Sequence, residues 1–213
     1  MTRYNPRRAA SVSSLVVILS LGSAQLGMAD ETVFKLPTVD YSADMVSESS
    51  GAARSAKVFH SGTKTRTELQ SGGHAIVSII DRGKMEAISI DPAKKSYIKI
   101  DLGKLGVGQD SAAMADYKPT LLGQETINGL ATSKYAYEGT SSGDTIKGTV
   151  WLTKDSIPVR TESTVITGGQ SVSATSHLDN LKVEKQDSAL FEVPAGYTER
   201  QMPGPMGSHD ADR

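Results

Sequence analysis

Short runs of β-branched and aliphatic residues, separated by tight polar turns, dominate residues 54–101. The clearest pair covers residues 74–80 and 85–90, which are joined by the turn Asp81-Arg-Gly-Lys84. Runs of this length, bounded by glycine, proline and aspartate, are strand signals, and the short links between them indicate antiparallel neighbours. The stretch therefore predicts consecutive strands of one antiparallel sheet.

The same pattern flanks this block on both sides. Residues 41–48 alternate, with Tyr41 and Met45 on one face and polar side chains on the other, which is typical of a strand with one wet side. After residue 120 the strands resume, and Asn128-Gly129 predicts a type I′ hairpin because both residues tolerate a positive φ. Between the two blocks, residues 110–117 have helix-forming composition; this connection is either a lid or a disordered loop.

About ten strands with one helical interruption predict a mainly β (α+β) domain. A sheet of this size must curl, because strand twist accumulates. Both alternating faces of residues 74–80 are apolar, so each side of the sheet needs cover. We therefore expect a strongly curved antiparallel sheet, or incomplete β-barrel, capped by one or two short helices and enclosing an apolar hollow.

The first 29 residues have the pattern of a secretory signal peptide: a cationic start, an apolar run and small residues up to Ala29. The apolar run is shorter than the roughly 20 residues of a membrane-spanning helix, and an uncleaved anchor is the alternative. Cleavage after Ala29 would leave one domain at residues 30–198. The tail at residues 199–213 is rich in proline and glycine, and we expect it to be disordered.

The amino-acid composition limits which cellular compartments and which classes of binding partner fit the chain. The chain has no cysteine, which excludes disulfides and thiolate metal sites. Loss of residues 1–29 removes three arginines and no acidic residue, so the formal net charge changes from −1 to −4. A mildly acidic chain with scattered lysines lacks the electrostatic footprint of a nucleic-acid binder. We expect a periplasmic monomer that binds no nucleic acid.

Candidate catalytic and metal-binding patterns are weak. Residues 139–143 fit the G-x-S-x-G pattern with Ser141 as nucleophile, but that motif needs a strand-to-helix turn, and strands are expected on both sides here. The four histidines lack ligand spacing such as H-x-x-x-H, and a metal site built from His60 and His74 is the remaining alternative. We expect no enzymatic activity, no metal and no cofactor.

The order of several short motifs resembles that of the periplasmic lipoprotein carrier fold (LolA/LolB-like). These motifs are a strand carrying Arg66, the apolar strand at residues 76–80, the Asp81-x-Gly-Lys84 turn and the Asp91-Pro92 turn. The ending at residues 187–197, Asp-x-x-x-Phe followed by Pro-x-Gly, is similar too. An uncharacterised group of exported proteins with the same fold resembles the chain still more closely, at residues 148–152 and 158–160.

The resemblance implies an incomplete β-barrel whose apolar concavity accepts acyl chains under a helical lid. The arginine that holds the family's lid closed corresponds to Arg66. It either points into the concavity, where lid carbonyls or a carboxylate would pair with it, or pairs with Glu68 on the strand surface. Carriers have aromatic residues after this arginine, whereas this chain has Thr67-Glu68-Leu69, which favours a general binder as much as lipoprotein transport.

We therefore predict a periplasmic, non-enzymatic carrier or binder of a hydrophobic ligand: a lipid, an acyl chain or a lipidated protein. The alternative is a structural or sensory envelope protein that engages another protein, such as a membrane-associated envelope protein, without a lipid. A one-residue register error would exchange the two faces of the sheet. The expected ligand-binding residues are Met45, Arg66, Val77, Ile79, Ile88, Ile90, Ile98, Ile100, Val150 and Leu152.

The sequence also predicts the surroundings of Trp151 and Arg160. Trp151, the single tryptophan, is expected in the core, with a place in the ligand pocket as the alternative. Arg160 is expected to pair with Glu162 or with an acidic residue on the neighbouring strand.

Overall fold

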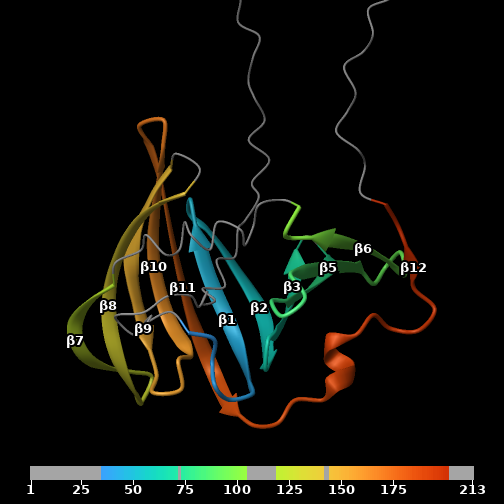
Figure 1. Ribbon diagram of the computed structural model, residues 1–213, viewed down its shortest axis with the longest axis horizontal. Coiled ribbons are helices and arrows are strands. Elements are labelled where there is room, and N and C mark those ends of the chain that lie inside the picture. The colour runs from blue at the N-terminus through green and yellow to red at the C-terminus, as the bar shows by residue number, and fades with distance from the viewer. Residues whose placement is uncertain (1–34, 72, 105–118, 142–143, 202–213) are drawn as a thin grey trace, which may run out of the picture.

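The computed structural model describes residues 35–71, 73–104, 119–141 and 144–201, and this part of the chain is nearly all β (Figure 1). Twelve strands form one sheet within these residues, in the order β12-β6-β5-β4-β3-β2-β1-β11-β10-β9-β8-β7. The strands are β1 (Tyr41–Ser49), β2 (Ala52–Ser61), β3 (Lys64–Ser71), β4 (His74–Asp81), β5 (Glu86–Asp91), β6 (Ser96–Asp101), β7 (Thr120–Ile127), β8 (Leu130–Ser141), β9 (Asp144–Leu152), β10 (Pro158–Thr167), β11 (Gln170–Val183) and β12 (Thr198–Glu199).

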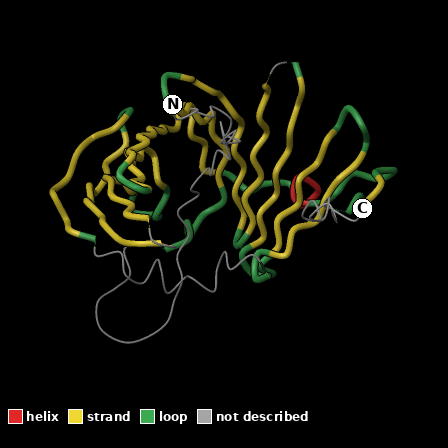
Figure 2. Tube along the Cα trace, turned by 90° about the horizontal axis from the view of Figure 1, so that it is seen from above, coloured by secondary structure: helices red, strands yellow, loops and turns green. Residues whose placement is uncertain are grey.

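Consecutive hairpins account for most of the sheet. Strands β1 to β6 pair in sequence order, strands β7 to β11 do the same, and only β12 runs parallel to its neighbour, β6. The two blocks join where β1 pairs with β11, with Met45 opposite Leu178. Figure 2 shows the result from above: the β7–β10 side curls round, while the β2–β6 side spreads open.

The expectation of a curved, open antiparallel sheet is confirmed, with twelve strands where the sequence predicted about ten. The capping helices are not seen in the described residues, which contain one four-residue 3-10 helix, η1 (Ser188–Phe191). The helix predicted at residues 110–117 and the signal peptide predicted at residues 1–29 lie outside the described residues. None of the helices in the described part is long and apolar enough to cross a membrane.

Cross-strand pairing divides the side chains between two faces. One row of cross-strand partners on β1 to β4 defines what we call the inner face of the sheet: Ala43, Val58, Thr67 and Ser78. The outer face carries the adjacent row: Phe59, Arg66, Ile79 and Ile88. The outer row of residues 74–80 is covered, because Val77 and Ile79 pack in a cluster with Phe191. The inner row is not fully covered as expected, since Ile76 is 45% exposed and the inner-face cluster around Met45 contains no residue of this stretch.

The outer face of the open side is covered by the closing segment, residues 184–197, which contains η1 (Figure 1). Phe191 is 6% exposed and packs with Val77, Ile79 and Ile90. Asp187 caps η1, because its side chain accepts a hydrogen bond from the backbone N–H of Ala189 at 2.9 Å. The Asp-x-x-x-Phe motif of the sequence is therefore a cap followed by a core residue.

The largest cluster lies where the two blocks meet and includes Tyr41, Met45, Val58, Leu178 and Trp151. Trp151 is buried there, as predicted for a core residue. Its ring is flanked by two cations, at 4.8 Å from Lys134 Nζ and 5.0 Å from Arg160 Cζ. The predicted pair of Arg160 with Glu162 is also present, at 2.6 Å.

Candidate functional site

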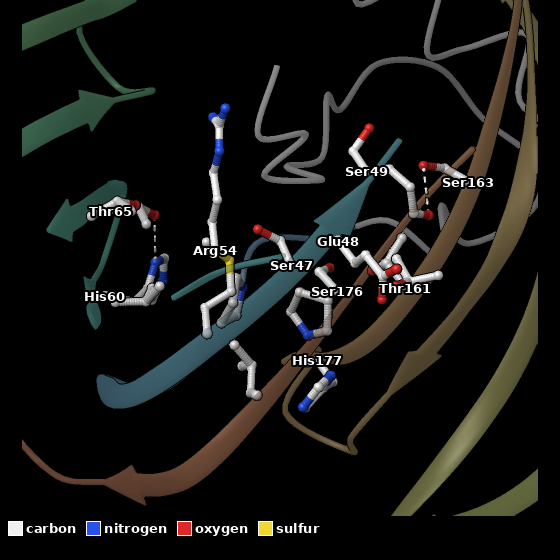
Figure 3. A pocket seen from close by; sticks show the side chains of 18 of the residues that line it. Ser47, Glu48, Ser49, Arg54, His60, Thr65, Thr161, Ser163, Ser176 and His177 are labelled. Carbon is white, nitrogen blue, oxygen red and sulfur yellow. Dashed lines mark hydrogen bonds between the residues drawn. The ribbon is translucent and has the colours of Figure 1, made fainter. Parts of the chain in front are cut away.

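A partly open cavity of about 280 Å³ lies on the inner face, between β1–β3 on one side and β10–β11 on the other (Figure 3). Its floor is apolar and consists of Tyr41, Met45, Val58 and Leu178. Its walls carry hydroxyl groups, from Ser47, Thr65, Thr67, Thr161, Ser163 and Ser176. The volume is just below the range of about 300–1,000 Å³ that is usual for ligand pockets.

The cavity follows the length of β1. Its lining includes both Tyr41 and Ser49, the first and last residues of that strand. Eight steps of roughly 3.3 Å along an extended strand correspond to about 26 Å. The cavity is therefore long relative to its volume, and a ligand that follows it must be narrow and extended.

One end of the cavity is lined by Leu36, Pro37 and His60. His60 is 1% exposed, its ring stacks on Tyr41 with the centroids 5.3 Å apart, and its Nδ1 lies 3.1 Å from Thr65 Oγ1. Its Nε2 has no hydrogen-bond partner of good geometry among the described residues. Burial lowers the pKa of His60, and the nearby Pro37 backbone offsets only part of this effect.

Tyr41 at the same end is neutral at physiological pH. Burial raises the pKa of its phenol to about 12, although the positive charge of Arg82 acts in the opposite direction. The same burial lowers the pKa of the Arg82 guanidinium. This end of the cavity thus offers neutral aromatic surface with one cation beside it.

Arg54 stands at the opposite end, on β2, where it lies across from Ser47 of β1. Its half-buried side chain lines the cavity, and no hydrogen bond or ion pair joins it to any residue that the structure describes. Figure 3 shows its guanidinium extended well apart from the other labelled side chains. Glu48, which is exposed, is the carboxylate at this rim.

Five of the ten expected ligand-binding residues lie on the inner face. Met45 lines the cavity. Val150 lies on β9 directly across from the cavity residue Thr161 of β10. Val150 and Leu152 are both buried in a neighbouring apolar cluster with Tyr137, and not in the cavity. Ile98 and Ile100 lie on β6, across from Ser89 and Ala87 of β5 on the inner face. Neither isoleucine lines the cavity.

The other five belong to the outer face. Four are apolar and lie in or against the cluster beneath the closing segment: Val77, Ile79, Ile88 and Ile90. The reason is the two-residue period of a strand: the row of Met45 continues through Ile76, so Val77 points the other way. The cavity therefore does not include these residues, and a ligand contact for them stays a prediction.

Arg66 is the fifth outer-face residue, and it meets both of its expected partners. Its Nη1 donates to the carbonyl oxygen of Leu190 at 2.8 Å, and its Nε donates to Glu68 at 2.7 Å. The segment that it holds is η1 on the outer face, not a lid over the cavity.

Sequence reasoning did not single out Arg54, nor His60 as a residue that lines the cavity. The signal available was the alternation of β2, in which Arg54, Ala56, Val58 and His60 occupy every second position. Local sequence patterns do not predict the pairing of β1 with β11, which brings Ser176 and Leu178 to the cavity from a distant part of the chain.

Ser141 and His74 are not among the residues that line the cavity. Ser141 ends β8 and β9 begins at Asp144, so the G-x-S-x-G stretch joins two strands; residues 142 and 143 lie outside the described part. His74 is exposed at the start of β4. Within the described residues, no group of three His, Cys, Asp or Glu side chains is placed to hold a metal ion.

Comparison with known proteins gives a family and a fold. The family "Domain of unknown function (DUF4412)" matches residues 43–182. No curated protein is similar enough in sequence to match the chain. Among solved structures, an uncharacterized conserved protein from Thermus thermophilus is similar, with a TM-score of 0.52 at 14% identity over 78% of this chain and 91% of that chain.

Two other solved structures are less similar in shape. The MucA/MucB complex of Pseudomonas aeruginosa has a TM-score of 0.46 at 15% identity, over 75% of this chain and 57% of that chain. A LolA superfamily protein from Nitrosomonas europaea has a TM-score of 0.36 at 10% identity, over 74% of this chain and 91% of that chain. The predicted resemblance to an uncharacterised group is confirmed by the Thermus structure, on which the fold likeness rests, and a LolA superfamily protein is among the other matches.

Proposed function

This chain belongs to the DUF4412 family of domains of unknown function, and we propose that it is a non-enzymatic binder or carrier of a ligand with a long apolar part. The observation that carries the proposal is the narrow cavity along β1, with its apolar floor of Tyr41, Met45, Val58 and Leu178. A lipid or a single acyl chain, free or attached to a protein, has the matching shape.

The driving force would be removal of apolar surface from water, worth about 25 cal/mol per Å². The inner face also stays partly apolar beyond the cavity, because Ile80, Ile98 and Ile100 are half-buried on β4 and β6. A chain longer than the cavity would have this surface to lie on. The periplasm is part of the proposal, and it is supported by the signal-like composition of residues 1–29.

Blocking the cavity tests the proposal. Ser47→Trp places an indole among the inner-face hydroxyls, whereas Ser55→Trp, at an exposed position of β2, serves as the matched control. We expect the wild type and Ser55→Trp to co-purify with lipid detectable by mass spectrometry and to bind a fluorescent fatty acid. Ser47→Trp should lose both properties while keeping its melting temperature. Absence of lipid and of fatty-acid binding in the wild type would remove the proposal.

A second candidate function is engagement of an extended segment of another protein by strand addition. It is favoured by β7, the last strand of the sheet, which has no neighbour on its outer edge among the described residues and exposes Leu121 (59%) and Leu122 (55%). Replacing both leucines with lysine should abolish capture of such a partner and leave fatty-acid binding unchanged. Loss of lipid binding in this variant would argue against a separate edge function.

A further inference from the structure

We propose that the ligand is an acidic amphiphile whose anionic head group is bound by Arg54 at one end of the cavity, with its apolar chain directed along β1 toward Tyr41. The inference rests on the proposed function and adds the class of ligand and its orientation. The shared chemistry of the head group is an oxyanion, a carboxylate or a phosphate.

Two other arginines of the sheet, Arg66 and Arg160, are paired with carboxylates, whereas Arg54 is paired with no described carboxylate. Arg66 lies 2.7 Å from Glu68 and Arg160 lies 2.6 Å from Glu162. Arg54 has no hydrogen bond or ion pair with any described residue, although its side chain is half-buried and lines the cavity. A guanidinium with five donors in a fixed fork is suited to bidentate binding of an oxyanion.

The neighbours of Arg54 suit the same head group. Ser47 lies directly across from Arg54 on β1, and Ser176 lies across from Ser47 on β11. Both hydroxyls line the cavity, and they could donate hydrogen bonds to an oxyanion held by Arg54 once its side chain, which extends away from them in Figure 3, turns toward their row. Three donor groups from three adjacent strands therefore lie in one inner-face row.

The opposite orientation of the ligand is less favourable. The far end contains Tyr41 and His60, both buried, and its cation, Arg82, is already engaged in an interaction within the protein. The rest of the apolar floor, with Met45, Val58 and Leu178, lies between this end and Arg54. A charged head group placed there would lose its hydration without gaining an unpaired cation. The apolar chain therefore belongs at the Tyr41 end.

Four probes with the same twelve-carbon chain separate the head groups: dodecanoate, dodecyl phosphate, dodecanol and dodecyltrimethylammonium. Each competes with the neutral fluorophore N-phenyl-1-naphthylamine for the purified protein. We expect dodecanoate or dodecyl phosphate to bind about tenfold tighter than dodecanol, a difference of about 1.4 kcal/mol, and the cation to bind weakest. Which of the two anions binds tighter identifies the head group.

The variant Arg54→Gln should bring the anion and the alcohol to similar affinity, and Arg54→Lys should keep part of the preference. Lys57→Gln is the matched control, because Lys57 lies three residues further along β2, exposed on the outer face and paired with Asp44. Equal binding of anion and alcohol by the wild type, or an unchanged preference in Arg54→Gln, overturns the inference and leaves the proposed function standing. Failure of all four probes removes the proposed function as well.

Discussion

The guanidinium of Arg66 on β3 donates a hydrogen bond to the backbone carbonyl of Leu190 in η1, across 124 residues of chain, with 2.8 Å between Nη1 and the oxygen. The same side chain donates from Nε to Glu68 and is 13% exposed. Phe191, the next residue after Leu190, is buried on the same face. The Arg66 hydrogen bond and the burial of Phe191 therefore both help to hold the closing segment on the sheet.

The variant Arg66→Ala should loosen the closing segment. The substitution removes a charge-assisted hydrogen bond from a largely buried position, where such bonds contribute roughly 1.5–3 kcal/mol, and it leaves the Leu190 carbonyl and Glu68 without this donor. We expect faster amide hydrogen exchange in residues 188–199 and a lower free energy of unfolding. The control, Arg160→Ala, removes a more exposed ion pair and should cost less than about 1 kcal/mol. Equal exchange rates in Arg66→Ala and wild type would contradict this role.

The variant Phe191→Ala should be more damaging than loss of the arginine contact. Phe191 fills the cluster formed with Val77, Ile79 and Ile90, and truncation of a buried phenylalanine costs about 3–5 kcal/mol. Urea denaturation gives the difference. Val172→Ala, at a side chain that is 51% exposed, should stay within about 0.5 kcal/mol of wild type. A small effect at Phe191 would mean that the closing segment adds little to the fold.

Local sequence signals were sufficient for the hairpins. Asn128 and Gly129 adopt φ values of 51° and 79°, as the predicted type I′ turn requires, and the pairing of β4 with β5 follows from the short turn after Asp81. The curvature followed from the number of strands, because twist accumulates across a wide sheet.

The candidate site was less predictable, for two physical reasons. Ile76 and Val77 are both apolar, so the pattern of β4 does not show which of its rows faces the cavity; Phe191, far along the chain, covers the row of Val77. The cavity also needs β11 beside β1, with Leu178 opposite Met45, and no local signal specifies a pairing between residues so distant in sequence. Met45 alone among the ten expected residues lines the cavity.

The variant Gly148→Ala should disrupt the curled side of the sheet. A Cβ at this position of β9 would collide with the backbone carbonyl oxygen of Glu162 on β10 and would lie 2.6 Å from the Tyr137 hydroxyl. Backbone atoms of a central strand cannot move aside easily, so we expect a loss of roughly 3 kcal/mol or more. Gly103→Ala, whose Cβ would meet the Asp101 side chain at 3.2 Å, is the milder control. Equal urea midpoints for the two variants would contradict the close approach.

The last prediction concerns His60 and the dependence of stability on pH. Burial lowers the pKa of His60 in the folded protein below its ordinary value of about 6.5. Above that ordinary value the imidazole is neutral in both the folded and the unfolded chain. As the pH falls below it, the unfolded chain binds a proton that the folded protein does not, so the free energy of unfolding decreases until the folded-state pKa is reached.

The variant His60→Phe keeps an aromatic ring beside Tyr41 but cannot titrate. Its free energy of unfolding should therefore change less than that of wild type as the pH is lowered through this window, as measured by urea denaturation at a series of pH values. His74→Gln, which removes an exposed histidine at the start of β4, controls for the loss of one imidazole. If His60→Phe and the wild type lose stability in parallel, the buried imidazole is not the group responsible, and the cavity end at Tyr41 must admit water or a counter-charge.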